Sequence, residues 1–235
     1  MFNLLKVEFY KLKKFQFGYI AVLFMFVMGY LCGDNRIGNK IFDSTDNTAR
    51  AFLFVSDTSL VFLISIVMAL FIGRDFSNRT ICNEIKMGYS RFHILFSRTI
   101  VVCVFAALLH TVYVISIILG FSVVRGFDAS VLRIENVLWL LTVLIQLMAV
   151  ISGVVLFSFI AKKVSEAIVL STLYTFICCN VLRNFLDASF FTRSCFCFVQ
   201  DNSKGSLAFS TISALVTMII FLAVAVFTFN KAEIE

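Results

Sequence analysis

The sequence predicts an all-α polytopic membrane protein, a single domain over residues 1–235 with an N-terminal surface helix and six membrane-spanning helices. Two observations predict this class. Hydrophobic residues make up 60% of the chain and its mean hydropathy is +0.98, whereas soluble domains are typically about 45–50% apolar. Charged residues, 14% of the total, lie between long apolar runs, and no polar stretch is long enough to fold as a soluble domain.

The first predicted element is an amphipathic surface helix over residues 2–14. Large apolar residues recur at helical spacing, and lysines supply cations that suit anionic lipid headgroups: Phe2, Leu5, Phe9 and Leu12, with Lys6, Lys11, Lys13 and Lys14. A simpler alternative is that these lysines only anchor the inner end of the first span. The N-terminus has no apolar core followed by a cleavage site, so no removed signal peptide is expected.

Six apolar runs are long enough to approach the roughly 30 Å hydrocarbon core as helices. They lie at residues 15–32, 52–73, 94–123, 137–160, 164–186 and 207–229, and the third crossing is expected to be shorter than its apolar run. Gly29 and Gly33 have a small-xxx-small spacing that permits close contact with another helix. Lys162 and Lys163 mark a tight turn between the fourth and fifth spans, which indicates an antiparallel helix pair.

The distribution of charge predicts that both termini lie in the cytoplasm. With that orientation, 12 of the 20 cations and 6 of the 14 acids fall inside, and the other 8 cations and 8 acids fall outside. Lys and Arg concentrate in cytoplasmic loops, so residues 74–93 are placed in the cytoplasm. The net charge of +6 is therefore interpreted as membrane topology, and no nucleic-acid partner is expected.

The sequence offers no catalytic set for chemistry inside the membrane. Its two histidines, His93 and His110, lie far apart in the helical scheme, and no acid occupies the middle of a span. The loop GDNRIGNK at residues 33–40 has two glycines of a phosphate-binding loop but lacks the Gly-Lys-Ser/Thr ending. The seven cysteines form no CxxC pair, so we expect no metal site, no cofactor in this chain and no disulfide framework.

Four polar residues in or near the spans are candidates for lining a pathway. His110 and Gln146 would be costly to expose to lipid, so they face either another helix, where they form an interhelical hydrogen bond, or a wet path. Asn180 and Arg183 lie near the outer end of the fifth span. They either line a substrate exit or, in the case of Arg183, reach out to the membrane interface.

The outer loop at residues 187–206 is unusually aromatic. It contains FFTRSCFCFV, a run that packs at the interface or dips into the outer leaflet more readily than it stays free in water. Its function is a lid, a substrate-contacting surface or an anchor. The sequence leaves these alternatives open, together with the role of Cys195 and Cys197.

A charged amphipathic segment, residues 72–98, separates the second and third spans. It carries five basic residues: Arg74, Arg79, Lys86, Arg91 and Arg98. Residues 80–92 predict a short amphipathic helix followed by a turn. Ile81 and Ile85 form its apolar face, and Glu84 and Lys86 lie on its polar side. Gly88 permits the chain to reverse direction after the helix. On physical grounds alone, the segment is either a docking element for a soluble partner or a solvated inner loop.

Several short motifs follow one another in a set order along the chain. The chain opens with Glu8-x-x-Lys11, and the acid Asp75 stands at the end of the second span. The pairs Thr80-Ile81 and Ser90-Arg91 and the basic residue Arg98 follow. FNKAEIE closes the chain with a basic-acidic-Ile sequence. This order resembles type-2 ATP-binding-cassette exporter permeases over the whole length. Two residues depart from the family pattern, Arg79 from its usual Gly and Arg98 from its common Lys.

The resemblance implies a membrane-spanning subunit of an exporter in the bacterial plasma membrane. It implies a separate dimer of ATPase subunits that binds ATP and Mg, and a second permease chain, identical or homologous, in the surrounding lipid. Residues 74–93 would then be a coupling segment, with these residues coupling to the ATPase: Asp75, Thr80, Ile81, Glu84, Ile85, Tyr89, Ser90 and Arg91. Ile85 and Tyr89 would seat in a groove of the ATPase, and Arg91 would pair with an acid there.

Small permeases of this size resemble exporters of antimicrobial or signalling peptides and of amphipathic drugs. The expected cargo is therefore an amphipathic peptide, of the antimicrobial or bacteriocin immunity type, or a drug-like molecule. The alternative is a membrane scaffold or sensor subunit that binds a cytoplasmic partner without moving a substrate. A transporter makes the ATP turnover of its partner respond to substrate, whereas a scaffold binds without that response.

Overall fold

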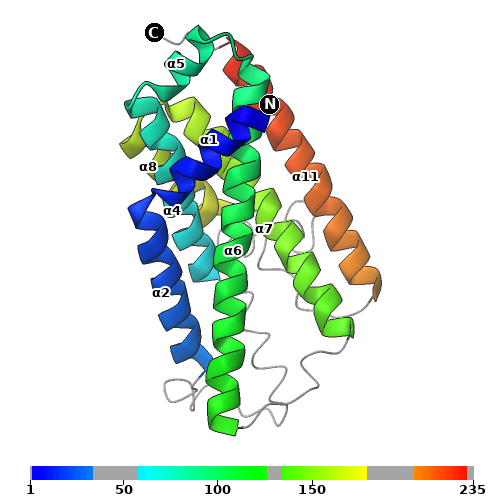
Figure 1. The fold of residues 1–235 in the computed structure, drawn as a ribbon. Coiled ribbons are helices and arrows are strands. Elements are labelled where there is room, and N and C mark those ends of the chain that lie inside the picture. The colour runs from blue at the N-terminus through cyan, green and yellow to red at the C-terminus, as the bar shows by residue number, and fades with distance from the viewer. Residues whose placement is uncertain (1, 34–57, 126–133, 179–203, 232–235) are drawn as a thin grey trace.

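The computed structural model describes residues 2–33, 58–125, 134–178 and 204–231, and the elements in them are helices (Figure 1). The helices are α1 (Phe2–Lys13), α2 (Gln16–Gly33), α4 (Thr58–Ser77), α5 (Thr80–Lys86), α6 (Arg91–Arg125), α7 (Ile134–Ala161), α8 (Val164–Phe176) and α11 (Lys204–Lys231). No strand occurs in this part of the chain, which confirms the predicted all-α class.

Within the described residues, five helices are long and apolar enough to cross a membrane. They lie at Gln16–Gly33, Leu60–Ser77, Arg91–Val123, Val137–Ala161 and Leu207–Lys231. The predicted fifth span, 164–186, begins with α8, which has 13 residues, and its residues beyond 178 lie outside the described part of the chain. A multi-pass membrane protein is thus confirmed, and the count of six spans stays a prediction.

The helix boundaries differ most from the predicted ones around the charged segment. α4 continues to Ser77 and α6 begins at Arg91, so both helices extend into the predicted segment 74–93, and α5 occupies its middle. α6 has 35 residues and is about 52 Å long at 1.5 Å per residue, which exceeds the roughly 30 Å hydrocarbon core. A membrane crossing by α6 is therefore shorter than the helix itself.

One end of the bundle holds α1, α5 and the C-terminal end of α11 (Figure 1). We call it the α5 end. From there α2 runs alongside α6, while α8 packs against α4 and α7, and α11 packs mainly against α7. α8 also begins at this end, because Val164 lies against Gly73 of α4, whereas α11 begins toward the opposite end. The side of the membrane on which the α5 end lies stays a prediction.

Small residues let α2 lie close against α6. The buried face of α2 consists of Gly18, Ala21, Met25, Gly29 and Gly33. A Cβ atom added at Gly29 would lie 2.7 Å from the Tyr113 carbonyl oxygen and 2.8 Å from Ser116 Cβ, so a larger residue does not fit there. Ser116 also donates a hydrogen bond to the Phe26 carbonyl oxygen. The close helix contact predicted at Gly29 and Gly33 therefore occurs, and α6 is the partner.

The core lies between α4, α6, α7 and α8, whereas α2 and α11 direct many apolar side chains outward. Exposed examples on these two helices are Ile20, Leu23 and Ile219. In a membrane such side chains face lipid, which takes the place of a protein core around them. Hydroxyl groups join the inner helices, as where Thr175 of α8 donates to Ser65 Oγ of α4 at 2.9 Å.

Candidate functional site

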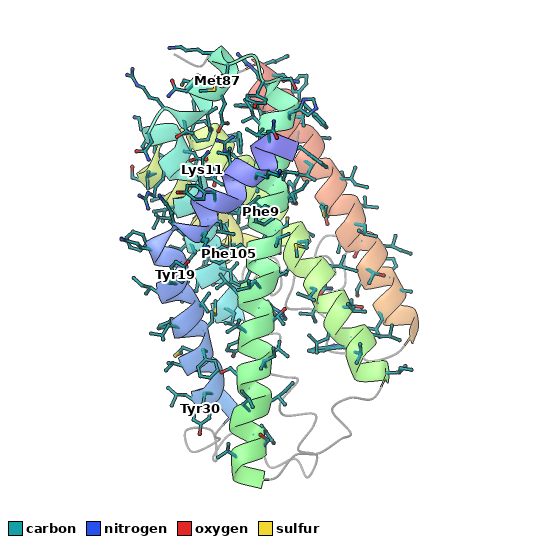
Figure 2. The ribbon with its side chains drawn as sticks, in the orientation of Figure 1. Phe9, Lys11, Tyr19, Tyr30, Met87 and Phe105 are labelled. Carbon is teal, nitrogen blue, oxygen red and sulfur yellow. The ribbon has the colours of Figure 1, made fainter. Side chains whose placement is uncertain are left out.

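Five charged side chains meet at the α5 end, next to the connection between α4 and α6. They come from four helices: Glu8 and Lys11 from α1, Asp75 from α4, Glu84 from α5 and Arg98 from α6. We call this group the charge cluster. Its four members other than Lys11 are buried, and Lys11 is half-buried on α1 where that helix crosses the bundle (Figure 2). Charges at this depth are stable only with charged partners.

Arg98 is the centre of the charge cluster, and its side chain is 0% exposed. Its Nε donates to Asp75 Oδ2 at 2.9 Å, which links α6 to the last turn of α4. Its Nη1 and Nη2 donate to the two carboxylate oxygens of Glu84 at 2.8 and 3.1 Å. This two-pronged pairing matches the planar guanidinium fork to a carboxylate, so α5 is held against α6 in one orientation.

Lys11 closes the charge cluster from α1. Its Nζ lies 2.7 Å from Glu8 Oε1, 3.1 Å from Glu84 Oε1 and 3.5 Å from Asp75 Oδ2. Burial acts to lower the pKa of Lys11, but the charges of Asp75 and Glu8 outweigh both burial and the repulsion of Arg98, so that pKa lies above its usual value. A single ammonium thus ties α1 to both α4 and α5.

The three acids of the charge cluster outnumber its two bases. Burial acts to raise the pKa of Glu84, but the hydrogen bonds and charges of Arg98 and Lys11 hold that pKa below its usual value. Burial raises the pKa of Glu8, and the attraction of Arg98 does not offset it. Glu8 Oε2 is buried and has no hydrogen-bond partner in the described part of the chain. Glu8 therefore binds a proton more readily than Glu84 does.

Two backbone positions set the turns on either side of α5. Gly88 has a φ of 88°, which confirms the chain reversal predicted there, because glycine adopts this conformation without penalty. Arg79, which precedes α5, has φ 53° and ψ 22°, a left-handed conformation that costs an L residue about 1–2 kcal/mol. The glycine that the resembled permeases usually have at this position would adopt the same conformation without that penalty.

The apolar face of α5 points into the protein. Ile81 is 0% exposed, and Ile85 is half-buried against the same core, as is Tyr89 beyond the turn. Thr80, the first residue of α5, is half-buried as well. We expected Ile85 and Tyr89 to seat in a groove of a partner, but in this structure the chain itself covers both of them in part, and it covers their neighbour Ile81 fully.

A different set of residues forms the exposed face of α5 and the turn after it. Arg79, Asn83, Lys86 and Met87 are exposed, and Met87 is 74% exposed at the tip of the α5 end (Figure 2). An exposed methionine flanked by cations offers an adaptable apolar contact inside a positive surface. The exposed side chains of α5 are therefore not the ones on its amphipathic apolar face.

The start of α6 places two further predicted residues. Ser90 precedes α6, and its Oγ accepts a hydrogen bond from the backbone N–H of His93 at 3.4 Å, an arrangement typical of a helix N-cap. The same Oγ is hydrogen-bonded to His93 Nδ1. Arg91 is half-buried, and its guanidinium donates to carbonyl oxygens at the end of α11. We expected Arg91 to pair with an acid of a partner, and here it holds another part of the same chain.

The candidate pathway residues are only partly described. His110 of α6 and Gln146 of α7 are both buried, on helices that pack against each other. Asn180, Arg183 and the loop 187–206 with its two cysteines lie outside the described residues. Among the residues that are described, no group of His, Cys, Asp and Glu is arranged to hold a metal ion.

The charge cluster includes three residues that the sequence analysis did not assign to the site, Glu8, Lys11 and Arg98. In the sequence they were noted only as parts of motifs or as basic residues of their segments. Arg98 carried a signal of its own, because it lies inside the predicted third span, where an arginine requires a buried acid. The i, i+3 pair of Glu8 and Lys11 gave no comparable signal, since such pairs are common on exposed helices.

A family model described as ABC-2 family transporter protein matches residues 4–178, which include every member of the charge cluster. The chain belongs to the ABC-2 transporter family. No curated protein and no solved structure matches it. An ABC-2 chain of this kind is the permease subunit of an ABC transporter, a multi-pass protein of the plasma membrane whose family implies an ATPase subunit as partner.

Proposed function

We propose that this ABC-2 permease uses the charge cluster to convert movement of an ATPase subunit into movement of its membrane helices, and so exports its cargo. One observation supports this above the others. Arg98, Lys11 and their three acids fasten α5 to α1, α4 and α6 at once. A push on α5 therefore reaches two candidate spans and the surface helix without passing through a flexible connection.

The exposed face of α5 is the proposed docking surface. Lys86 is the neighbour of Met87, and Arg79 lies at the other end of α5, so the matching surface of the ATPase is acidic with an apolar site for Met87. In this arrangement the ATPase does not touch Glu84 or Ile81; these two residues instead anchor α5 from within. Asp75 acts in the same way from the end of α4.

The remaining parts of the proposal follow from the family. ATP and Mg are bound by a dimer of ATPase subunits, and two permease chains, alike or homologous, form the pathway between them. This chain itself carries no catalytic role. The cargo is an amphipathic peptide of the antimicrobial or immunity type, or a drug-like molecule, and the aromatic outer loop 187–206 suits such a cargo in its composition.

Affinity purification of the tagged chain in mild detergent tests this proposal. The double variant Lys86→Glu with Met87→Asp reverses the charge and removes the apolar contact on the docking surface. Lys6→Glu with Val7→Asp is a matched control, because Lys6 and Val7 are neighbours of the same types on the exposed face of α1. We expect the wild type and the control to recover an ATPase. The docking variant should recover at most about one tenth of that amount, because a loss of roughly 1.4 kcal/mol of binding free energy lowers the affinity tenfold.

The same preparation separates a transporter from a scaffold. We expect the ATP turnover of the recovered complex to rise with a cationic amphipathic peptide from a tested panel. Equal ATPase recovery from the docking variant would reject the proposed surface. If a partner binds but its ATP turnover ignores every peptide, the scaffold or sensor function replaces export; if the wild type recovers no ATPase, the coupling proposal fails.

A further inference from the structure

Arg91, the first residue of α6, is bound to the far end of the chain rather than to the charge cluster. Its Nη1 donates hydrogen bonds to the carbonyl oxygens of Phe229 and Asn230, both at 2.9 Å. Its guanidinium carbon lies 5.9 Å from the centre of the Phe229 ring. The last carbonyls of a helix have no partner within the helix and carry the negative end of its dipole, so Arg91 is well suited to hold the C-terminal end of α11.

Phe229 continues this contact across the bundle. Its ring is 2% exposed and packs edge-to-face on Phe159 of α7, with 4.9 Å between ring centres. Phe159 packs in the same way on Phe76 of α4, at 5.3 Å. We call these three rings the aromatic chain. Edge-to-face pairs have a preferred geometry, so the rings fix the relative positions of three helix ends more closely than aliphatic contacts would.

Arg91 and the aromatic chain share two helices, α6 and α4, with the charge cluster. Phe76 follows Asp75 directly at the end of α4, so α4 contributes to both. Arg91 and Arg98 are seven residues apart in α6, close to two full turns, and therefore lie on similar faces of it. The turn after α5 leads into Arg91 through Ser90. α5 is therefore linked to both networks, to the charge cluster through Glu84 and to Arg91 through the turn that follows α5.

We propose that Arg91 and the aromatic chain carry the movement of α5 to the last candidate span, α11, an inference that rests on the proposed coupling function. Arg91 is then a positioning residue, and its partner is the end of α11 instead of an acid on the ATPase. α11 suits the role of the moving helix, because few of its side chains are fully buried and it packs chiefly on α7. A helix with few packed neighbours shifts at low cost, and it follows whichever element holds its end.

The first test measures whether Arg91 holds α11 in the isolated chain. Hydrogen exchange of the purified protein, read by mass spectrometry, reports the protection of amides in the last turns of α11. We expect Arg91→Gln to speed this exchange about tenfold, the factor that corresponds to roughly 1.4 kcal/mol for hydrogen bonds to a charged group. Arg91→Lys keeps the charge but not the planar fork, so its effect should be intermediate.

Arg74→Gln is the matched control for that test. Arg74 also lies at the end of a helix with its guanidinium 5.8 Å from a phenylalanine ring, but that ring is Phe15, beside the junction of α1 and α2. Its replacement should leave the exchange of α11 unchanged. Equal exchange in Arg91→Gln and the wild type would overturn the proposal, because the arginine would then not restrain α11.

The second test measures transmission, in the complex with the co-purified ATPase. Trapping the ATPase with ATP and vanadate should change the exchange of the α11 end in the wild type. In Arg91→Gln and in Phe159→Leu, which removes a ring of the aromatic chain but stays apolar, that change should be lost while complex yield and basal ATP turnover persist. A residue with only a structural role would not remove this nucleotide-dependent difference.

The outcomes separate this inference from the function on which it rests. If the wild type yields an ATPase and the nucleotide-dependent change in α11 persists in Arg91→Gln, the transmission proposal is overturned and the coupling function stands. If the wild type yields no ATPase, the coupling function and the transmission step fail together. The exchange of the isolated chain then still shows whether Arg91 restrains α11.

Discussion

Glu8 and Glu84 are both buried carboxylates, yet they have opposite roles in the charge cluster. Glu84 accepts from two nitrogens of Arg98 at 2.8 and 3.1 Å, whereas Glu8 Oε1 lies 3.4 Å from Arg98 Nη2. Glu8 also leaves Oε2 without a hydrogen bond. Loss of charge at Glu84 would remove the bidentate partner of a fully buried guanidinium, whereas loss of charge at Glu8 would leave both hydrogen-bonded acids of Arg98 in place.

We therefore expect the two Glu→Gln variants to differ in stability. Glu84→Gln should lower the free energy of unfolding by about 3 kcal/mol, as expected when one partner of a buried ion pair is removed. Glu8→Gln should leave it unchanged or raise it slightly at neutral pH. The melting temperature in detergent, followed by the fluorescence of the buried single tryptophan Trp139, measures both effects. Similar losses in the two variants would contradict the assignment of Arg98 to Glu84.

At the scale of the helical element, the start of α5 is strained by the left-handed conformation of Arg79. Arg79→Gly should relieve this strain and stabilise the protein by about 1 kcal/mol, since the penalty for an L residue is about 1–2 kcal/mol and glycine loses more chain entropy on folding. Arg79→Ala removes the same side chain but keeps the strain, so it serves as the control and should not stabilise. A higher melting temperature for the alanine variant would show that the side chain, rather than the backbone, is responsible.

The sequence predicted that α5 exists, that it is amphipathic and that the chain reverses at Gly88, because helical periodicity and a glycine are local signals. It did not predict which face of α5 would be buried. Ile81 and Ile85 suit a groove on a partner as well as they suit the core of their own chain, and only the positions of α1, α4 and α6 decide between the two. The same limit applies to Arg91, whose partners lie 138 and 139 residues further along the chain.

At the scale of the whole molecule, most long-range polar contacts of the described residues gather at the α5 end. The five candidate spans of the described residues were predictable, because each contains an apolar run of sufficient length. The spacing of Gly29 and Gly33 predicted a close helix contact, but it did not indicate that α6 would be the partner of α2. The charge cluster required residues separated by up to 90 positions, from Glu8 to Arg98, and no local pattern encodes such a meeting.

The charge cluster also predicts how the stability of the whole protein depends on pH. The pKa of Glu8 lies above its ordinary value of 4.5 in the folded protein, so folding favours its protonated form, and stability should rise as the pH falls from neutral toward 4.5. The pKa of Glu84 lies below 4.5, so its stabilising charge is fully present above 4.5 and is lost as the pH falls through its lower folded value. Together they predict a maximum of stability on the acidic side of neutrality.

Glu8→Gln separates the two contributions to this pH dependence. The groups that act on Glu8 are Arg98 on α6, Asp75 on α4 and Lys11 on α1, and Glu8 shares Lys11 and Arg98 with Glu84 on α5. In the variant the melting temperature should no longer rise between neutral pH and about 5, because the group that gains a proton there is gone. The fall below about 4.5 should remain, since Glu84 and Arg98 are intact. A wild-type melting temperature that falls steadily from neutral pH would show that Glu8 stays ionised, and that the attraction of Lys11 and Arg98 outweighs its burial.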